Sequence, residues 1–386
     1  AAKEVIQGNY AEQFPIDIFQ TGSGTSTNMN MNEVLANLAN KLTGVELHPN
    51  DDLNMSQSSN DVIPTATHVA AAIELEEQLL PALRLLVQTL EQKEQQLAGI
   101  IKTGRTHLMD ATPISFPQEL SAWRHLILDN IARLKDTQKR IQKLPQGGTA
   151  VGTGINADPK FGALVCTNLT EMTSINFEPM ENLFVGLSSQ DTALELSGQL
   201  NVLASSLMKI ANDLRWMNSG PLAGLGEIQL QALQPGSSIM PGKVNPVIPE
   251  SVCMVAAQIM GNHTAITIGA QSGNFQLNVM LPMVAANLLQ SLEIAGNAAT
   301  QLAEQAIATF IVNTEKLQET LEANPILVTA LNRIVGYETG SAIAKAAYKD
   351  VKPVLEVALE MTDLDKETLK KYLNPALLTQ GGNPSI

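Results

Sequence analysis

Three long stretches of this sequence are apolar around most of a helix circumference. They lie at residues 188–217, 247–269 and 274–310, where Leu, Ile, Val, Met and Ala recur at helical spacing with few charged residues between them. A helix with apolar residues all round has to be buried on several sides, and long helices of this kind usually pack into bundles that oligomerise. We therefore expect an all-α fold with a long central helical bundle.

Other periodic patterns, less apolar than these, predict further helices. They cover residues 31–42, 64–97, 117–144 and 160–172, and a glycine-rich segment at 145–159 predicts a loop. For the first helix, Ser26 or Thr27 is the expected N-cap and Gly44 the expected C-terminal stop. In the second, Pro81 predicts a kink or break, because proline cannot donate the backbone hydrogen bond that continues a helix.

The C-terminal part of the chain has a different pattern. After residue 313 the helical segments become shorter, more polar and amphipathic. The sequence therefore predicts a helical N-terminal domain in residues 1–57, a central long-helix bundle in 58–313 and a small C-terminal helical domain in 314–386.

The net charge of the chain excludes some classes of binding partner. The chain has 24 Lys and Arg residues against 38 Asp and Glu residues, for a formal net charge of −14. A surface of this sign repels nucleic-acid backbones and anionic membranes, and no apolar stretch approaches the length that spans a membrane. An anionic substrate would need a locally positive site.

The sequence gives no support for a metal site or for a disulfide framework. The five histidines are scattered, and none pairs with another His or Cys at a spacing such as H-x-x-x-H. Cys166 and Cys253 each lie in an apolar helical pattern, which argues against a disulfide framework or an iron–sulfur cluster. We expect no metal, no cofactor and a reducing compartment.

Two polar segments are candidates for binding an anion. Residues 21–28 (TGSGTSTN) place hydroxyl groups before a helix, where free backbone N–H groups and the helix dipole favour a carboxylate or phosphate. Taken alone, such a cluster is more often a helix cap. Residues 48–61 (HPNDDLNMSQSSND) form a polar connection, for which a series of surface turns and a binding loop have about equal support.

Two further segments carry residues suited to proton transfer. Residues 102–111 (KTGRTHLMDA) place His107 beside a hydroxyl group and near an arginine, although a lone histidine is more often structural. Residues 236–246 (GSSIMPGKVNP) surround Lys243 with glycines, prolines and tandem serines, and Glu250 follows one turn into the next helix. A rigid turn explains the prolines but not the lysine and serines.

Taken in this order, the four segments resemble the fumarase/aspartase superfamily over the whole chain. Residues 236–246 are similar to its signature sequence, and residues 104–111 resemble the class II fumarases. Aspartate ammonia-lyases tend to carry Gln at the position of His107. Fumarases of this class usually have a further N-terminal helical segment, so the resemblance implies that residues 1–57 are the remainder of a longer domain.

The resemblance implies a hydro-lyase that interconverts fumarate and (S)-malate in the tricarboxylic acid cycle, without metal or cofactor. Ser237 would abstract the C3 proton of malate. His107, held by Glu250, would act through an activated water on the hydroxyl side. The residues that would hold the dicarboxylate are Ser23, Gly24, Thr25, Ser58, Ser59, Asn60, Thr106, Ser238, Lys243, Val244 and Asn245.

A secondary dicarboxylate site is also implied by the resemblance. Its residues would be His48, Asn50 and Asp51. Val45 occupies a position where relatives can carry a basic residue, which lowers the expected affinity of this site.

The chemistry of the implied base sets a condition on the structure. A serine hydroxyl is a poor base unless backbone N–H groups or a cation stabilise its alkoxide. The carboxylate next to the abstracted proton gains negative charge and needs donors and a cation. We expect the loop around Lys243 to supply both the backbone N–H groups and the cation that these charges need.

Two other functions remain open at this point. One is an aspartate ammonia-lyase of the same superfamily, which His107 disfavours, and the other is a non-catalytic helical scaffold, which the chemical residues disfavour. The resemblance further implies a homotetramer whose active sites are shared between subunits. We expect a bacterial cytoplasmic protein, and the mitochondrial matrix is the alternative.

Overall fold

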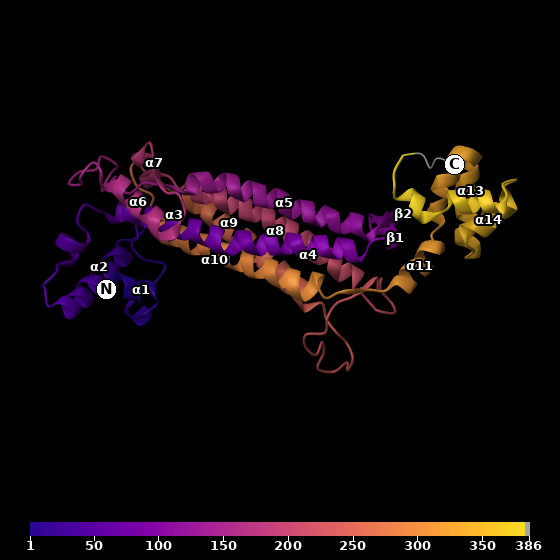
Figure 1. Ribbon diagram of the computed structural model, residues 1–386, viewed down its shortest axis with the longest axis horizontal. Helices are drawn as coiled ribbons and strands as arrows, with labels where there is room; N and C mark the ends of the chain where they lie inside the picture. Colours follow the sequence, from indigo (N-terminus) through magenta and orange to yellow (C-terminus); the bar gives the residue numbers. More distant parts are fainter. Residues whose placement is uncertain (383–386) are drawn as a thin grey trace. The chain divides into compact units, whose positions relative to one another are not determined.

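The structure is a computed structural model that describes residues 1–382, and long helices dominate it (Figure 1). The strands in this part of the chain are two to seven residues long and form three two-stranded sheets. The expected all-α class is therefore confirmed. The long helices are α4 (Leu80–Gln96), α5 (Phe116–Ile141), α8 (Asp191–Met217), α9 (Val247–Ala270) and α10 (Leu281–Gln301).

The chain divides into two compact units, each made of several segments. Unit 1 comprises Ala1–Arg84, Leu128–Met208 and Val252–Thr300, and unit 2 comprises Leu85–Ile127, Lys209–Ser251 and Gln301–Ile386. The division into residues 1–57, 58–313 and 314–386 stays a prediction.

In unit 1, buried polar contacts join the long helices to one another. Ser197 on α8 is hydrogen-bonded to His263 on α9 at 3.0 Å, and Asn262 on α9 donates to Ser291 on α10 at 3.0 Å. Between these contacts the helices bury Leu and Ile side chains, including Leu200, Leu203 and Leu288, which are fully buried. These helices therefore share one core, as their apolar pattern predicted.

The helix before Pro81 is interrupted by a π-helical turn. Helix α3 (Ser59–Glu74) continues into the π-helical turn η3 (Leu75–Leu79), and α4 begins one residue before Pro81. Proline removes a backbone donor and crowds the preceding turn, and widening that turn accommodates the ring. The expected irregularity thus takes the form of a π-helical turn.

The start of α2 (Thr25–Thr43) differs from expectation. Its N-cap is Gly24, with φ +75° and no side-chain cap, so the predicted caps Ser26 and Thr27 are wrong. A side chain at Gly24 would lie 2.9 Å from Ile63, which explains why glycine occupies this turn. The predicted stop at Gly44 is confirmed, with φ +70°.

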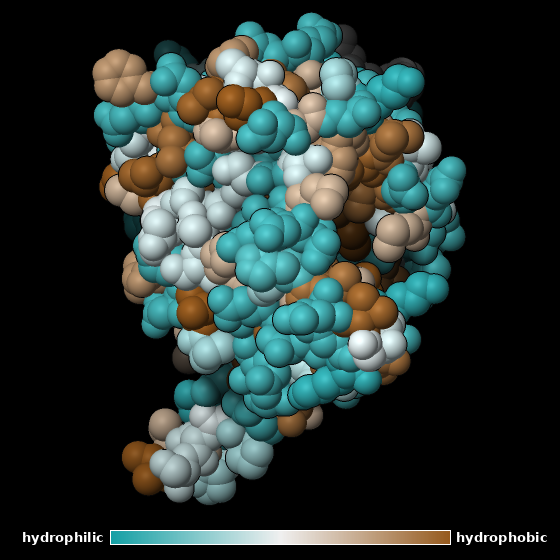
Figure 2. Space-filling model, turned by 90° about the vertical axis from the view of Figure 1, so that its left-hand side faces the viewer, coloured by the Kyte–Doolittle hydropathy of each residue, from teal (hydrophilic) through white to brown (hydrophobic). Residues whose placement is uncertain are grey.

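The remaining elements of unit 1 are short. At the end of this unit that carries α2 and α6, apolar residues lie exposed in patches among hydrophilic ones (Figure 2), and Phe19, Leu42 and Met172 are 85%, 60% and 70% exposed. Strands β3 and β4 pair in parallel. The bounds are α1 (Ala2–Ile6), η1 (Ala11–Gln13), η2 (Pro49–Leu53), β3 (Lys143–Leu144), α6 (Phe161–Thr173), β4 (Glu178–Pro179) and α7 (Leu183–Ser188).

In unit 2, a β-hairpin stands where the sequence indicated only a polar segment. Strand β1 (Ile101–Thr106) pairs antiparallel with β2 (Met109–Ser115). The short pair β5 (Ile228–Gln229) and β6 (Ile311–Val312) is also antiparallel. Three consecutive buried residues in β1 hide the alternation that marks a half-buried strand, so the pattern gave no strand signal.

The C-terminal helices of unit 2 have a hydrophobic cluster of their own. Leu331, Ile343, Ala358 and Leu369 lie at its centre and are fully buried. No helix among residues 1–382 is both long enough and apolar enough to cross a membrane. The bounds are η4 (Leu302–Ile307), α11 (Thr314–Glu322), η5 (Pro325–Leu331), α12 (Asn332–Val335), α13 (Tyr337–Asp350), α14 (Val354–Met361), α15 (Lys366–Tyr372) and α16 (Pro375–Leu378).

Candidate active site

Unit 1 brings two of the predicted binding segments together at the starts of α2 and α3. Ser23 and Thr25 are hydrogen-bonded through their hydroxyl groups at 2.7 Å. Asn28, in the first turn of α2, donates to the Ser59 hydroxyl in the first turn of α3 at 3.1 Å. The hydroxyl and amide side chains at these two helix starts thus lie close together, an arrangement of uncharged polar groups that suits an anion near the helix N-termini.

A buried carboxylate that the sequence analysis missed holds the second of these segments. Asp61 accepts hydrogen bonds from the backbone N–H groups of Ser58, Gly147 and Thr149 at 2.9, 3.0 and 2.9 Å. Burial raises the pKa of Asp61, and these hydrogen bonds oppose the shift. The signal was present, because Ser58 and Asp61 form the S-x-x-D pattern of a capping box.

His107 lies at the tip of the β1–β2 hairpin. Thr106 ends β1, and His107 and Leu108 form the two-residue turn with φ values of 57° and 61°. Such turns usually carry Asn, Asp or Gly, so non-glycine residues here store backbone strain of the kind found at functional sites. The exposed imidazole lines a cavity of about 410 Å³ together with Arg105, Lys209 and Asp213.

The Ser237 hydroxyl is surrounded by backbone donors. Its Oγ accepts hydrogen bonds from the N–H groups of Ile239 at 3.3 Å and Met240 at 3.0 Å. Because these two donors point at the oxygen, they stabilise negative charge on it. The arrangement therefore meets the condition that a serine base requires.

The ends of the loop at residues 236–246 are held together by side chains. Lys243 Nζ donates to Asn245 Oδ1 at 2.7 Å, and Asn245 Nδ2 donates to the Gly236 carbonyl at 2.8 Å. A Cβ atom on Gly236 would lie 2.1 Å from the Lys243 carbonyl, so this position requires glycine. Lys243, Ser238 and Val244 are exposed and free to meet a ligand.

Glu250 lies in a different cavity from His107. A cavity of about 760 Å³ is lined by Lys243, Asn245, Glu250 and Arg215, and His107 is not part of its wall. Within residues 1–382, neither the His107 nor the Glu250 side chain makes a hydrogen bond or ion pair. A single copy of the chain therefore does not bring the predicted His107–Glu250 pair together.

The residues of the predicted secondary site surround the turn η2. His48 Nδ1 accepts from the backbone N–H groups of Asn50 at 3.3 Å and Asp51 at 3.2 Å. The Asp51 carboxylate lies 3.4 Å from the same nitrogen. An Nδ1 atom that accepts two hydrogen bonds carries no proton, so we regard this contact as a close approach and not as an ion pair.

No group of three or more His, Cys, Asp or Glu side chains within residues 1–382 is arranged to hold a metal ion. Within the same residues, neither Cys166 nor Cys253 forms a disulfide.

The chain is similar to known proteins over nearly its whole length. Residues 1–261 match the family model described as lyase, and residues 327–380 match the model described as fumarase C C-terminus. A class II fumarate hydratase of Xylella fastidiosa is 57% identical over 382 residues, which cover 99% of this chain and 81% of that protein. The chain belongs to the class II fumarase family.

Further relatives agree with membership in the class II fumarase family. A class II fumarate hydratase of Pseudomonas aeruginosa is 55% identical over 379 residues, covering 98% of this chain and 83% of that protein. The crystal structure of a class II fumarase from Schistosoma mansoni superposes with a TM-score of 0.95 at 39% identity, and covers 98% of this chain and 84% of that one. The class II fumarase fold is thus shared over nearly the whole chain.

Proposed function

We propose that this class II fumarase is a fumarate hydratase, which adds water across the double bond of fumarate to give (S)-malate and catalyses the reverse reaction. The observation that carries this proposal is the Ser237 hydroxyl with its two backbone donors, next to Lys243 in the same loop. The 57% identity to a protein named fumarate hydratase supports the assignment of the substrate.

In the dehydration direction, Ser237 takes the C3 proton of malate. The N–H groups of Ile239 and Met240 stabilise the alkoxide that accepts this proton. Lys243 and Asn245 bind the carboxylate adjacent to C3, where negative charge grows as the proton leaves. Mobility of the glycine-containing loop lets it close over the substrate and exclude water.

The hydroxyl group of malate leaves as water on the opposite side of the substrate. His107 delivers the proton for this step through a bound water, and Thr106 hydrogen-bonds the substrate beside it. The positive φ of His107 holds its imidazole at an exposed hairpin tip, which supports a role toward an external ligand. In the hydration direction the same groups exchange their acid and base roles.

The residues of unit 1 bind a substrate carboxylate. Ser23, Gly24 and Thr25 begin α2, and Ser58, Ser59 and Asn60 begin α3. Their hydroxyl and amide side chains supply donors without a full charge.

The His107–Glu250 pair forms between subunits of a homotetramer. Its members line different cavities of one chain, which supports a partner from another copy. Helix α9 also supports assembly: after Glu250 it has no charged residue over its remaining length, yet Met254 and Ile268 are 68% and 54% exposed. Such a surface is typical of one covered by another subunit.

The secondary dicarboxylate site at His48, Asn50 and Asp51 is proposed to bind weakly. Val45 is exposed and contributes no charge, and the nearby carboxylate of Asp51 repels an anion. A cytoplasmic location in a bacterium is the further proposal, supported by the bacterial origin of the relatives reported above.

One absorbance assay tests the proposed function. Fumarate absorbs in the ultraviolet, whereas malate and aspartate do not have its conjugated double bond. We expect absorbance to rise after (S)-malate is added and to stay constant after aspartate is added. A rise with aspartate alone indicates an ammonia-lyase, and no change with either compound indicates a non-catalytic scaffold; both results contradict the proposal.

A further inference from the structure

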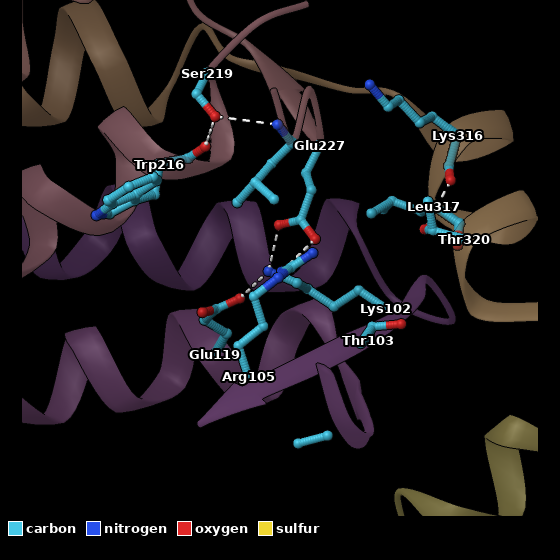
Figure 3. A network of polar contacts seen from close by, with 12 residues as sticks. Lys102, Thr103, Arg105, Glu119, Trp216, Ser219, Glu227, Lys316, Leu317 and Thr320 are labelled. Atoms are coloured by element: carbon cyan, nitrogen blue, oxygen red, sulfur yellow. Dashed lines mark hydrogen bonds and ion pairs between the residues drawn. The ribbon is translucent and has the colours of Figure 1, made fainter. Parts of the chain in front are cut away.

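A buried carboxylate in unit 2 holds two cations from the strand that carries the hairpin tip. Glu227 Oε1 lies 2.7 Å from an Arg105 guanidinium nitrogen, and Glu227 Oε2 lies 2.7 Å from Lys102 Nζ (Figure 3). Lys102 also pairs with Glu119 at 2.7 Å. The side chains of Lys102 and Glu227 are each only 3% exposed, whereas those of Arg105 and Glu119 are 19% and 20% exposed. The two cations and two anions thus balance in a cluster whose centre is buried.

The backbone of Glu227 is fixed as firmly as its side chain. Its N–H donates to the Met217 carbonyl at 2.8 Å, and its carbonyl accepts from the Asn313 N–H at 2.9 Å. Strand β5 begins at the next residue, and the chain then runs directly to the loop at residues 236–246. Glu227 therefore lies where the segment leading to Ser237 leaves the body of unit 2.

The energetics of such a cluster favour a role in positioning. Removing charged groups from water offsets much of their mutual attraction, and well-packed apolar residues often give equal or greater stability. What an ion-pair cluster adds is a defined geometry, because the Glu227 carboxylate accepts a hydrogen bond from Arg105 and lies at ion-pair distance from Lys102. In this chain that geometry joins β1 to the start of β5 across 122 residues of sequence.

The hairpin tip needs this support. Arg105 precedes His107 by two residues, and both line the same cavity. The turn at His107 and Leu108 has positive φ at both positions, a strained conformation that persists only when surrounding structure holds it. The Arg105–Glu227 ion pair joins β1 to the strand that leads to the Ser237 loop. Of the contacts that make this connection, it lies closest in sequence to the hairpin tip.

We propose that Glu227 is a positioning residue for the hydration reaction. By holding Arg105 and Lys102, it sets the orientation of the hairpin tip that carries His107 and ties the hairpin to the base of the loop that carries Ser237. The expected effect of Glu227 on catalysis rests on the proposed function. The link that Glu227 makes between the hairpin and the base of the loop does not depend on that function.

The test is Glu227→Gln, which keeps the size of the side chain and removes its charge. We expect kcat for fumarate hydration to fall on the order of 10²-fold with KM nearly unchanged, because misplacing a catalytic group by about 1 Å has effects of this size. The matched control is Glu119→Gln, which removes the same charge from Lys102 but leaves Arg105 paired; its kcat should stay near that of the unmodified chain. Equal kcat losses in the two variants would overturn the proposal.

Amide hydrogen exchange tests the link without any need for turnover. In Glu227→Gln the amides of residues 101–115 and 228–235 should exchange on the order of tenfold faster than in Glu119→Gln. Exchange requires local opening of these segments, and in Glu227→Gln the ion pairs no longer restrain that opening. Unchanged exchange in both segments overturns the proposal even if kcat falls. If the unmodified chain does not hydrate fumarate, the proposed function fails, and the exchange result alone then decides whether Glu227 makes the link.

Discussion

At the scale of the residue, the proposed chemistry of this fumarase depends on how a serine hydroxyl becomes a base. The Ser237 oxygen accepts from two backbone N–H groups, and Lys243 belongs to the same loop. A substitution by proline that removes a backbone donor also changes the course of the backbone, so the most direct test removes the oxygen that the donors contact.

Ser237→Ala should lower kcat on the order of 10²- to 10⁴-fold, because a proton acceptor is lost. KM or the affinity for a competing dicarboxylate should change little, since Lys243 and Asn245 keep their mutual contact. Steady-state kinetics and a binding titration measure the two effects. Ser238→Ala, at the neighbouring exposed serine, is the control and should act mainly on KM. Near-normal kcat in Ser237→Ala would show that another group is the base.

His107→Asn should lower kcat on the order of 10²-fold, because asparagine hydrogen-bonds but does not transfer protons. The comparison is His125→Asn, which changes an exposed histidine on α5 whose Nδ1 contacts the Ser121 carbonyl at 2.7 Å. That variant should retain full activity. A loss of less than tenfold in His107→Asn would assign the proton transfer to a different residue.

The sequence indicates candidate site residues more readily than their surroundings. Hydroxyl, imidazole and ammonium groups in short motifs indicate chemistry directly, whereas Gly147, which donates to Asp61, and Glu227, which pairs with Arg105, lie 86 and 122 residues away. No local pattern reports such contacts. The hairpin at His107 was missed because its turn has neither Asn nor Gly, the residues by which a two-residue turn is usually recognised.

At the scale of the element, apolar periodicity located several long helices to within a few residues, but the spans predicted at 31–42 and 274–310 differ more from α2 and α10. The predicted span 247–269 corresponds to Val247–Ala270, whereas the predicted single helix 64–97 is interrupted by a π-helical turn. Periodicity arises from burial and is therefore visible in the sequence. Caps and π-turns depend on backbone angles such as the positive φ of Gly24.

Helix α3 carries a buried histidine that makes stability depend on pH. His68 is 3% exposed and contacts the Lys143 carbonyl at 2.9 Å through Nδ1, and burial lowers its pKa below the ordinary value of 6.5. The unfolded chain thus binds a proton more readily than the folded one. The stability that follows is fully present above the unfolded pKa and is lost as pH falls through the lowered folded pKa.

Replacing His68 with Gln should therefore flatten the fall of the thermal unfolding midpoint between about pH 7 and pH 5. Glutamine fills a similar space and donates to the same carbonyl but does not titrate. His125→Gln, at an exposed position, should leave the fall unchanged. An identical pH profile in His68→Gln and the unmodified chain would assign the dependence to other groups.

At the scale of the whole molecule, the proposed active site requires more than one copy of the chain. His107 and Glu250 line different cavities, and α9 exposes apolar side chains. The apolar pattern of the central helices in the sequence predicted that copies of the chain assemble. The periodicity carries no information about which residues of two copies meet.

Mixing two inactive variants tests whether sites are shared. After His107→Asn and Glu250→Gln tetramers are dissociated and reassembled together, activity should return to roughly a quarter of the unmodified level, because random assembly pairs an intact His107 with an intact Glu250 at that frequency. Each variant treated alone is the control and should stay inactive. No recovery in verified mixed tetramers would place both residues in a site within one chain.

The central claim concerns the reaction itself, and proton NMR of fumarate incubated with the protein in D₂O tests it most directly. The account predicts (S)-malate with one deuterium at C3, because the proton that Ser237 delivers comes from the solvent. It also predicts no aspartate when ammonium is added. Formation of aspartate in place of malate, or no product from a correctly assembled tetramer, would contradict the account.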